Sequence, residues 1–178
     1  MALNHKYIKH PGRTLSIVFL ISILITACTV QYKFSGANIS INVKTISIAP
    51  FQNRASLVQP GLTNKITDAL IDKCKAQTKL SFINGTGDVS FEGEITDYNS
   101  RPLTVGADSR AAMNRFTITV KVKFVNSIEP DNSFENKVFS RYKDYDSNLD
   151  LSSVEASLTD DIVSQLVEDI FNEAFTKW

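Results

Sequence analysis

The sequence predicts an α+β fold, with two helices packed on one face of a mixed, mostly antiparallel sheet in the order β-α-β-β-β-β-α. Two stretches, one starting near residue 60 and one at the C-terminal end, repeat apolar residues at helical spacing. Between them lies a run of segments in which apolar and polar residues alternate, as strands with one buried face do. A run of strands combined with two helices favours this class over an alternating α/β fold.

The first part of the chain is typical of a secretory signal. Residues 1–14 hold three basic residues and no acidic residue, and residues 15–25 form an apolar run broken only by serine. This run is about half of the roughly 20 residues that a membrane-spanning helix needs. We therefore expect residues 1–27 to be a cleaved signal peptide.

The signal ends in a motif that resembles the bacterial lipobox, Ile25-Thr26-Ala27-Cys28. In such motifs the cysteine receives a diacylglycerol thioether, and cleavage before it frees an amine for a third acyl chain. The alternative is an ordinary signal peptide followed by a chance cysteine. We expect lipidation of Cys28, and therefore attachment to a membrane through a lipid anchor. Because residue 29 is threonine and not aspartate, we expect the outer membrane, on its periplasmic side.

The composition of the mature chain excludes several classes of function. Residues 28–178 hold sixteen basic and nineteen acidic residues, a net charge of −3, so we expect no nucleic-acid partner. Both histidines, His5 and His10, lie in the signal, which removes histidine-dependent triads and histidine metal sites from the mature protein. We expect no cofactor and no metal. Residues 28–44 are predicted to be the lipidated N-terminus and tether, and residues 45–178 a single periplasmic domain.

The domain is predicted to begin with a strand at 45–51, which Pro50 ends, and a loop at 52–59. Pro60 suits the first turn of a helix of four to five turns. Its apolar face comprises Leu62, Ile66, Ala69, Leu70 and Cys74. Cys74 on that face is predicted to be a buried structural thiol; the alternative is a reactive one.

Four strands are predicted next, at 80–83, 89–98, 115–126 and 133–145. Residues 84–88 contain two glycines and are predicted to form a hairpin turn; a phosphate-binding loop is the alternative, but it needs a following helix. Residues 99–113 are predicted to be a long loop. Residues 129–132 are predicted to be a hairpin turn. The strand at 133–145 alternates poorly because Phe139 is out of phase with its neighbours, which indicates a bulge or a two-sided strand.

The last helix is predicted to start at a capping box, Ser152-Ser153-Val154-Glu155. A wide apolar stripe then runs to Phe175, and such a stripe packs on a sheet. Nine acidic residues and one lysine lie between residues 144 and 178, so we expect the exposed face of the helix to be acidic.

The sheet face away from the helices is predicted to be polar, with Glu92 and Glu94 on one strand and Lys121 and Lys123 on the next. Two carboxylates at this spacing suit an inverting glycosidase. The simpler interpretation is that they pair with the two lysines across the sheet, and we expect no catalytic residue.

One basic cluster on this face is a candidate binding site. Arg115, Lys121 and Lys123 fall on the same face of one strand and could contact the phosphates of an anionic glycolipid such as lipopolysaccharide. The alternative is an ordinary solvated sheet face.

The order of elements and several segments resemble one family. The likeness is carried by residues 45–74, Phe91–Ile95, Asn114–Phe124, Phe139–Tyr142, Leu151–Glu155 and the helix ending in Trp178. Together these segments resemble the LptE family of lipopolysaccharide-assembly lipoproteins over almost all of residues 28–178.

The resemblance implies a lipoprotein of the outer membrane that sits in the lumen of the large β-barrel LptD. There it would plug and help assemble the barrel that inserts lipopolysaccharide into the outer leaflet. Arg115, Lys121 and Lys123 are not carried over from the family; they rest on strand geometry alone. The alternative function is an accessory or regulatory lipoprotein of another envelope machine, such as a cell-wall synthase activator or a transporter component.

Overall fold

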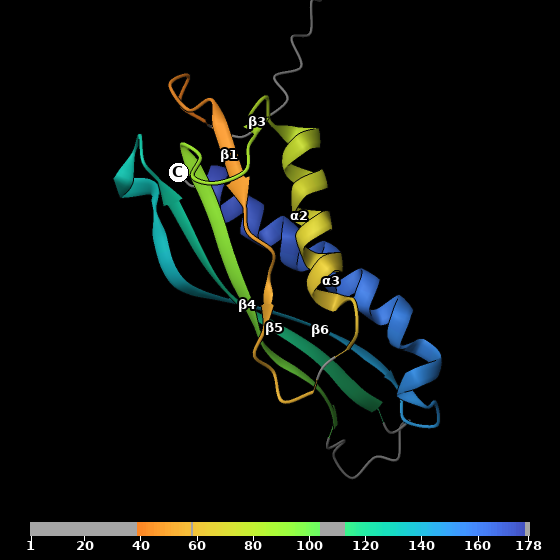
Figure 1. Ribbon diagram of the computed structural model, residues 1–178. Helices are drawn as coiled ribbons and strands as arrows, with labels where there is room; N and C mark the ends of the chain where they lie inside the picture. The colour runs from red at the N-terminus through yellow and green to blue at the C-terminus, as the bar shows by residue number, and fades with distance from the viewer. Residues whose placement is uncertain (1–38, 58, 104–112, 177–178) are drawn as a thin grey trace, which may run out of the picture. The chain divides into compact units, whose positions relative to one another are not determined.

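The computed structural model describes residues 39–57, 59–103 and 113–176 (Figure 1). The predicted signal peptide, Cys28 and most of the predicted tether lie outside these residues. No helix formed by the described residues is long and apolar enough to cross a membrane.

A six-stranded mixed sheet and two helices make up the domain, which confirms the predicted α+β fold. The elements in chain order are β1 (Thr45–Ile48), β2 (Gln52–Asn53), α2 (Leu62–Gln77), β3 (Ser81–Phe82), β4 (Val89–Pro102), β5 (Met113–Asn126), the short 3-10 helix η1 (Pro130–Asn132), β6 (Phe134–Asp146) and α3 (Leu151–Phe175). The strand order is β3-β1-β4-β5-β6, and β2 also pairs with β4. The long pairings β4–β5 and β5–β6 are antiparallel, whereas the short β1, β2 and β3 pair in parallel.

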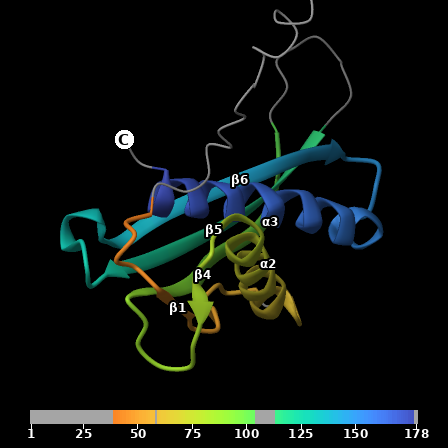
Figure 2. The same ribbon diagram turned by 90° about the horizontal axis from the view of Figure 1, so that it is seen from above.

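Both helices pack on the same face of the sheet, as predicted (Figures 1 and 2). The buried side chains of α2 and α3 meet those of the alternating strands in one core. Aromatic rings fill the core where α3 ends: Phe91 and Phe124 lie 4.7 Å apart between centroids, and Phe175 lies 5.5 Å from Phe124. No helix formed by the described residues covers the opposite face of the sheet.

Helix α2 shows the predicted apolar face. Leu62, Ile66, Leu70 and Cys74 are all buried. Burial raises the pKa of the Cys74 thiol to about 12, so the thiol stays protonated and is a structural group, as predicted.

The predicted capping box is wrong. Helix α3 begins at Leu151, and Asp150 occupies the N-cap position without a side-chain hydrogen bond to the helix. Glu155 instead accepts a hydrogen bond from the Tyr98 hydroxyl of β4. Burial, together with this hydrogen bond, raises the pKa of Tyr98. The Glu155 carboxylate, which a capping box would use, therefore binds the hydroxyl of a buried tyrosine instead.

The acidic face of α3 is largely neutralised by ion pairs, a feature that the periodicity does not predict. Bases of α2 pair with it from one side and bases of β6 from the other. The pairs are Lys65–Asp160 at 2.5 Å, Lys73–Glu168, Lys137–Glu173 at 2.6 Å, Arg141–Asp169 at 2.5 Å and Lys143–Asp161 at 2.9 Å. These pairs hold the helix in register with both neighbours.

The segment 83–88 is not a hairpin turn, contrary to the prediction. β3 and β4 lie on opposite sides of β1, and both run parallel to it, so the segment between them crosses over β1 (Figure 1). Gly87 makes the crossing possible, because a Cβ atom there would lie 3.0 Å from the backbone of Ile46 and of Ser47. The glycine-rich composition therefore serves a close backbone approach as well as a turn.

Two predicted loops are partly strand. The 52–59 loop contains β2, and the 99–113 loop is shortened because β4 extends to Pro102 and β5 begins at Met113. Pairing with a long neighbour extends these strands beyond their own sequence signals.

The predicted irregularity of β6 is confirmed as a bulge: the β5–β6 register shifts between Val122 and Phe124, opposite Asn136 with its positive φ of 53°.

The Asp88 side chain binds the crossing segment to the start of β1, and we expect the stability that it contributes to depend on pH. Its carboxylate accepts the backbone N–H groups of Lys44 (2.8 Å) and Thr45 (2.9 Å), and these bonds lower its pKa below the usual value. The contribution to stability is therefore complete above pH ~4 and is lost as the pH falls through the folded pKa. Asp88→Asn should be less stable than the wild type at pH 7 in urea titrations, and this difference should shrink below pH ~4.

Asp131→Asn is the matched control for this prediction. Asp131 is exposed in η1, and no side-chain hydrogen bond or ion pair is found for it among the described residues. A difference between Asp88→Asn and the wild type that stays constant from pH 7 to acid pH would contradict the role of the Asp88 carboxylate.

Candidate functional site

The open face of the sheet carries the predicted polar residues in the predicted register. Glu94 lies directly opposite Lys121, and Glu92 lies directly opposite Lys123, on the antiparallel pair β4 and β5. All four side chains are half-buried or exposed, while the alternate residues of β5 are buried under the helices. Simple alternation therefore places them correctly, because register and pleat are linked.

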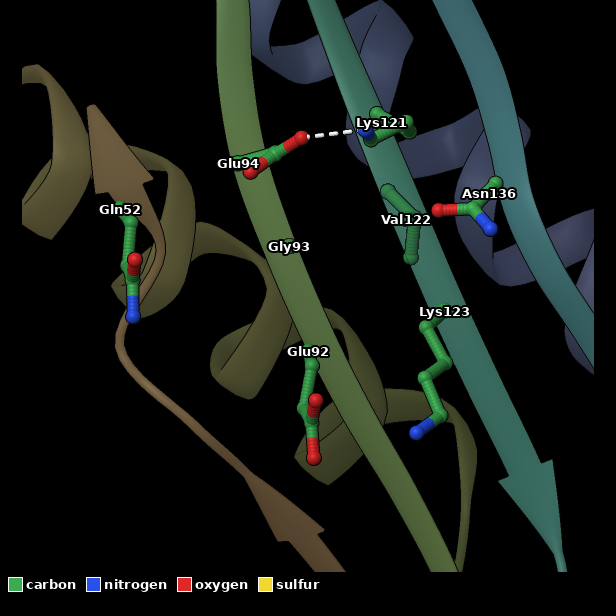
Figure 3. Close-up of a pocket in the computed structure, with 8 residues that line it drawn as sticks. All are labelled: Gln52, Glu92, Gly93, Glu94, Lys121, Val122, Lys123 and Asn136. Carbon is green, nitrogen blue, oxygen red and sulfur yellow. Dashed lines mark ion pairs between the residues drawn. The ribbon is translucent and has the colours of Figure 1, made fainter. Parts of the chain in front are cut away.

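A shallow polar pocket of about 280 Å³ lies on this face (Figure 3). Residues of β2, β4, β5 and β6 line it: Gln52, Glu92, Gly93, Glu94, Lys121, Val122, Lys123 and Asn136. Gln52 enters through the parallel pairing of β2 with β4, which sets it beside Glu94. Figure 3 shows the side chains of Glu92 and Lys123 near one end of the pocket and the Glu94–Lys121 pair near the other.

The ion pairs leave the two lysines in different states. Lys121 Nζ lies 2.5 Å from Glu94 Oε1, and Arg54 approaches the other oxygen of the same carboxylate at 3.8 Å. Lys123 Nζ has only a long contact of 3.9 Å, with Glu135. Because a long, half-exposed pair contributes little, Lys123 can exchange its partner for a ligand anion more easily than Lys121 can.

Arg115 lies on the same face but in a different place. Six residues of extended strand separate it from Lys121, which is roughly 20 Å. Its guanidinium donates two hydrogen bonds to Asp144, at 2.8 and 2.9 Å, and stacks 3.6 Å from the centre of the Tyr142 ring. The hydrogen bonds raise the pKa of Arg115 and lower that of Asp144. The three predicted contact residues thus share a face without forming one site.

The sequence analysis missed two residues that line the pocket, Gln52 and Asn136, and Arg54, which contacts the pocket residue Glu94. Gln52 and Arg54 belong to β2 and its continuation, which are too short to show alternation. Asn136 reaches the pocket through the bulge of β6, for which the only sequence signal is the broken phase near Phe139.

Comparison with known proteins agrees with this fold. A family model described as "LptE: Lipopolysaccharide-assembly" matches residues 43–174. No curated protein matches the chain.

Solved structures share the architecture at low sequence identity. Protein XCC0632 from Xanthomonas campestris is similar, with a TM-score of 0.54, 11% identity, and coverage of 80% of this chain and 88% of that one. Lipoprotein B from Nitrosomonas europaea has a TM-score of 0.49, 13% identity, and coverage of 72% and 80%. A minor lipoprotein from Acinetobacter baumannii has a TM-score of 0.43, 12% identity, and coverage of 74% and 91%. At these identities only the first comparison carries an argument, and it concerns the fold alone.

Proposed function

Because this chain belongs to the LptE family of lipopolysaccharide-assembly lipoproteins, we propose that it is anchored through lipidated Cys28 in the outer membrane, facing the periplasm. There it occupies the lumen of an LptD-like β-barrel, plugs it, and helps to assemble it for the insertion of lipopolysaccharide into the outer leaflet. The observation that carries this proposal is the family match, which spans residues 43–174 and therefore nearly the whole described domain.

The open sheet face supports this role. The lumen of a large outer-membrane barrel is polar, so a plug must present polar surface to it. The face formed by β4, β5 and β6 carries ion pairs and hydroxyls, including the Thr119–Ser140 hydrogen bond of 2.9 Å. Such a face can lie against a hydrated wall without a large desolvation cost.

We propose Lys123 as the leading glycolipid contact, followed by Lys121 and Arg115. A lipopolysaccharide phosphate competes only with the long Lys123–Glu135 pair, whereas it must displace short pairs at Lys121 and Arg115. Charge-assisted hydrogen bonds to phosphate strengthen binding most where the lysine has the weakest internal partner.

Lys123→Ala should lower the amount of lipopolysaccharide that co-purifies with the protein by roughly three- to tenfold, the effect of losing one solvent-exposed hydrogen bond of about 1 kcal/mol. Lys121→Ala should have a smaller effect. The lipopolysaccharide bound per mole of purified protein is the quantity to measure.

Lys143→Ala is the matched control, because Lys143 pairs with Asp161 of α3 on the helix side of the sheet. Equal losses in Lys123→Ala and Lys143→Ala would assign the binding to general charge and not to this face.

A hydrolase is the competing class, and the geometry disfavours it. Glu94 is engaged with Lys121 and Arg54, so it is not free to act as the partner of Glu92. We propose a binding and assembly role without catalysis. Replacing both glutamates by glutamine should leave outer-membrane assembly intact; its complete loss with the fold preserved would favour an enzyme.

Affinity purification of the tagged lipoprotein from mildly solubilised membranes tests the proposed partnership. A stoichiometric large β-barrel that survives stringent washing is the expected result. Recovery of a cell-wall enzyme or a transporter without a barrel would overturn it and favour the accessory-lipoprotein alternative.

A further inference from the structure

The unpaired cations of the domain are unevenly distributed. All but four of the lysine and arginine side chains that the structure describes form ion pairs. The four without an ion pair among the described residues are Lys44, Lys75, Lys79 and Arg101. The first three lie at one end of the domain, where α2 ends and where the chain leads into β1.

The same end carries an apolar groove of about 530 Å³. Ile39, Ile41 and Leu80 contribute its apolar lining, and Lys44 and Lys79 also line it. Ile41 is 83% exposed, the highest value among the large apolar side chains of the described residues. The combination of an apolar groove with lysines that form no ion pair is typical of a surface that lies on an anionic membrane.

Carboxylates do not oppose these lysines in the groove. None of the described residues that line it is acidic. The neighbouring Asp88 accepts the backbone N–H groups of Lys44 and Thr45, and its carboxylate also interacts electrostatically with Lys44. Three lysines against this one carboxylate leave the surroundings of the groove positively charged, although the mature chain as a whole is acidic.

The position of this end in the chain, close to Cys28, indicates that the surface it would contact is a membrane. Ile39 follows Cys28 by only eleven residues, so even a fully extended connection would reach no more than ~40 Å. If Cys28 is lipidated, the bilayer surface lies within that distance of the groove.

We propose that the surface formed by Ile41, Lys44, Lys75 and Lys79 docks on the anionic leaflet that holds the lipid anchor. The lysines would contact lipid phosphates, and Ile41 would enter the interface. Each lysine near an anionic leaflet strengthens attachment about fivefold. Docking would fix the orientation of this end of the domain relative to the membrane. The inference rests on the lipid anchor of the proposed function.

An environment-sensitive fluorophore on Asn42→Cys tests the docking. The mature lipoprotein, with its bound proteins retained, is reconstituted into phosphatidylethanolamine–phosphatidylglycerol vesicles that contain a headgroup spin label as quencher. The label goes to the new cysteine because Cys74 is buried. A label on Leu57→Cys, 60% exposed in the loop before α2, is the control, because the ~24 Å length of α2 separates that loop from the end of the helix at the groove.

We expect a blue shift and quenching at position 42 and not at position 57. Lys44→Gln/Lys75→Gln/Lys79→Gln should lower the ratio of docked to free domain about a hundredfold. Arg101→Gln, which removes the fourth unpaired cation, should change nothing. Protein that stays on the vesicles but shows no contact at position 42 would overturn the docking and leave the anchor intact. Protein that leaves the vesicles and lacks acyl mass on its Cys28 peptide would overturn the anchor, and the docking with it.

Discussion

Phe124→Ala should lower the free energy of unfolding by about 3–5 kcal/mol, the usual cost of removing a fully buried phenylalanine side chain. Phe124 has no exposed surface, and its ring meets Phe91, Phe134 and Phe175 at centroid distances of 4.7, 5.5 and 5.5 Å. These rings come from β4, β6 and α3, so one truncation loosens three elements. Urea titration followed by circular dichroism measures the change.

Val125→Ala provides the comparison, because the next residue of β5 points to the opposite, half-exposed face. It should cost less than about 1 kcal/mol, as substitutions of partly exposed side chains usually do. Similar losses in the two variants would contradict the assignment of β5 faces on which the candidate site depends.

The faces of β5 were predictable because they follow from local alternation. A strand with apolar residues at every second position can bury only one face, and the polar residues must then share the other. The register that sets Glu92 opposite Lys123 and Glu94 opposite Lys121 follows from the same pattern. The predicted ion pairs are only half confirmed, because Glu94 pairs with Lys121 whereas Lys123 contacts Glu135 and not Glu92.

The position of β1 between β3 and β4 was not predictable in this way. Its partners β3 and β4 lie 36 or more residues further along the chain, and both pairings are short. No local pattern distinguishes a turn that reverses a hairpin from one that crosses over a strand. The close approach of Gly87 to the backbone of β1 is visible only in three dimensions.

Whether the candidate contact residues form ion pairs also depends on residues that are distant in the sequence. Arg115 was predicted as a candidate phosphate contact, yet the register of β6 sets Asp144 directly opposite it. That register depends on the one extra residue that the bulge at Asn136 adds to β6. The sequence showed a disturbed phase in this strand but not how many residues the bulge contains, so the ion pair could not be foreseen.

Gly93→Ala should cost about 2–3 kcal/mol, near the upper end of the usual cost of overpacking a core. Gly93 lies between Glu92 and Glu94 in the pocket, but a Cβ atom there would point to the other side, 2.3 Å from Cε1 of Phe51. Phe51 is 3% exposed, and its N–H donates to Thr67 of α2 at 3.0 Å, so it has little room to move.

The double variant Gly93→Ala/Phe51→Leu distinguishes a steric clash from a loss of glycine flexibility. If the Phe51 ring is the obstacle, the smaller leucine relieves it, and the double variant should be more stable than the sum of the two single losses predicts. Additive losses would locate the cost in the backbone of β4 instead. If the smaller side chain removes the clash, the result would also link the packing of the core to the shape of the pocket. Phe51 precedes Gln52, so a displaced Phe51 ring would move the side of the pocket that β2 forms. Weaker glycolipid binding in Gly93→Ala, restored in the double variant, would then show that the pocket keeps its shape because a glycine lets the core pack directly behind it.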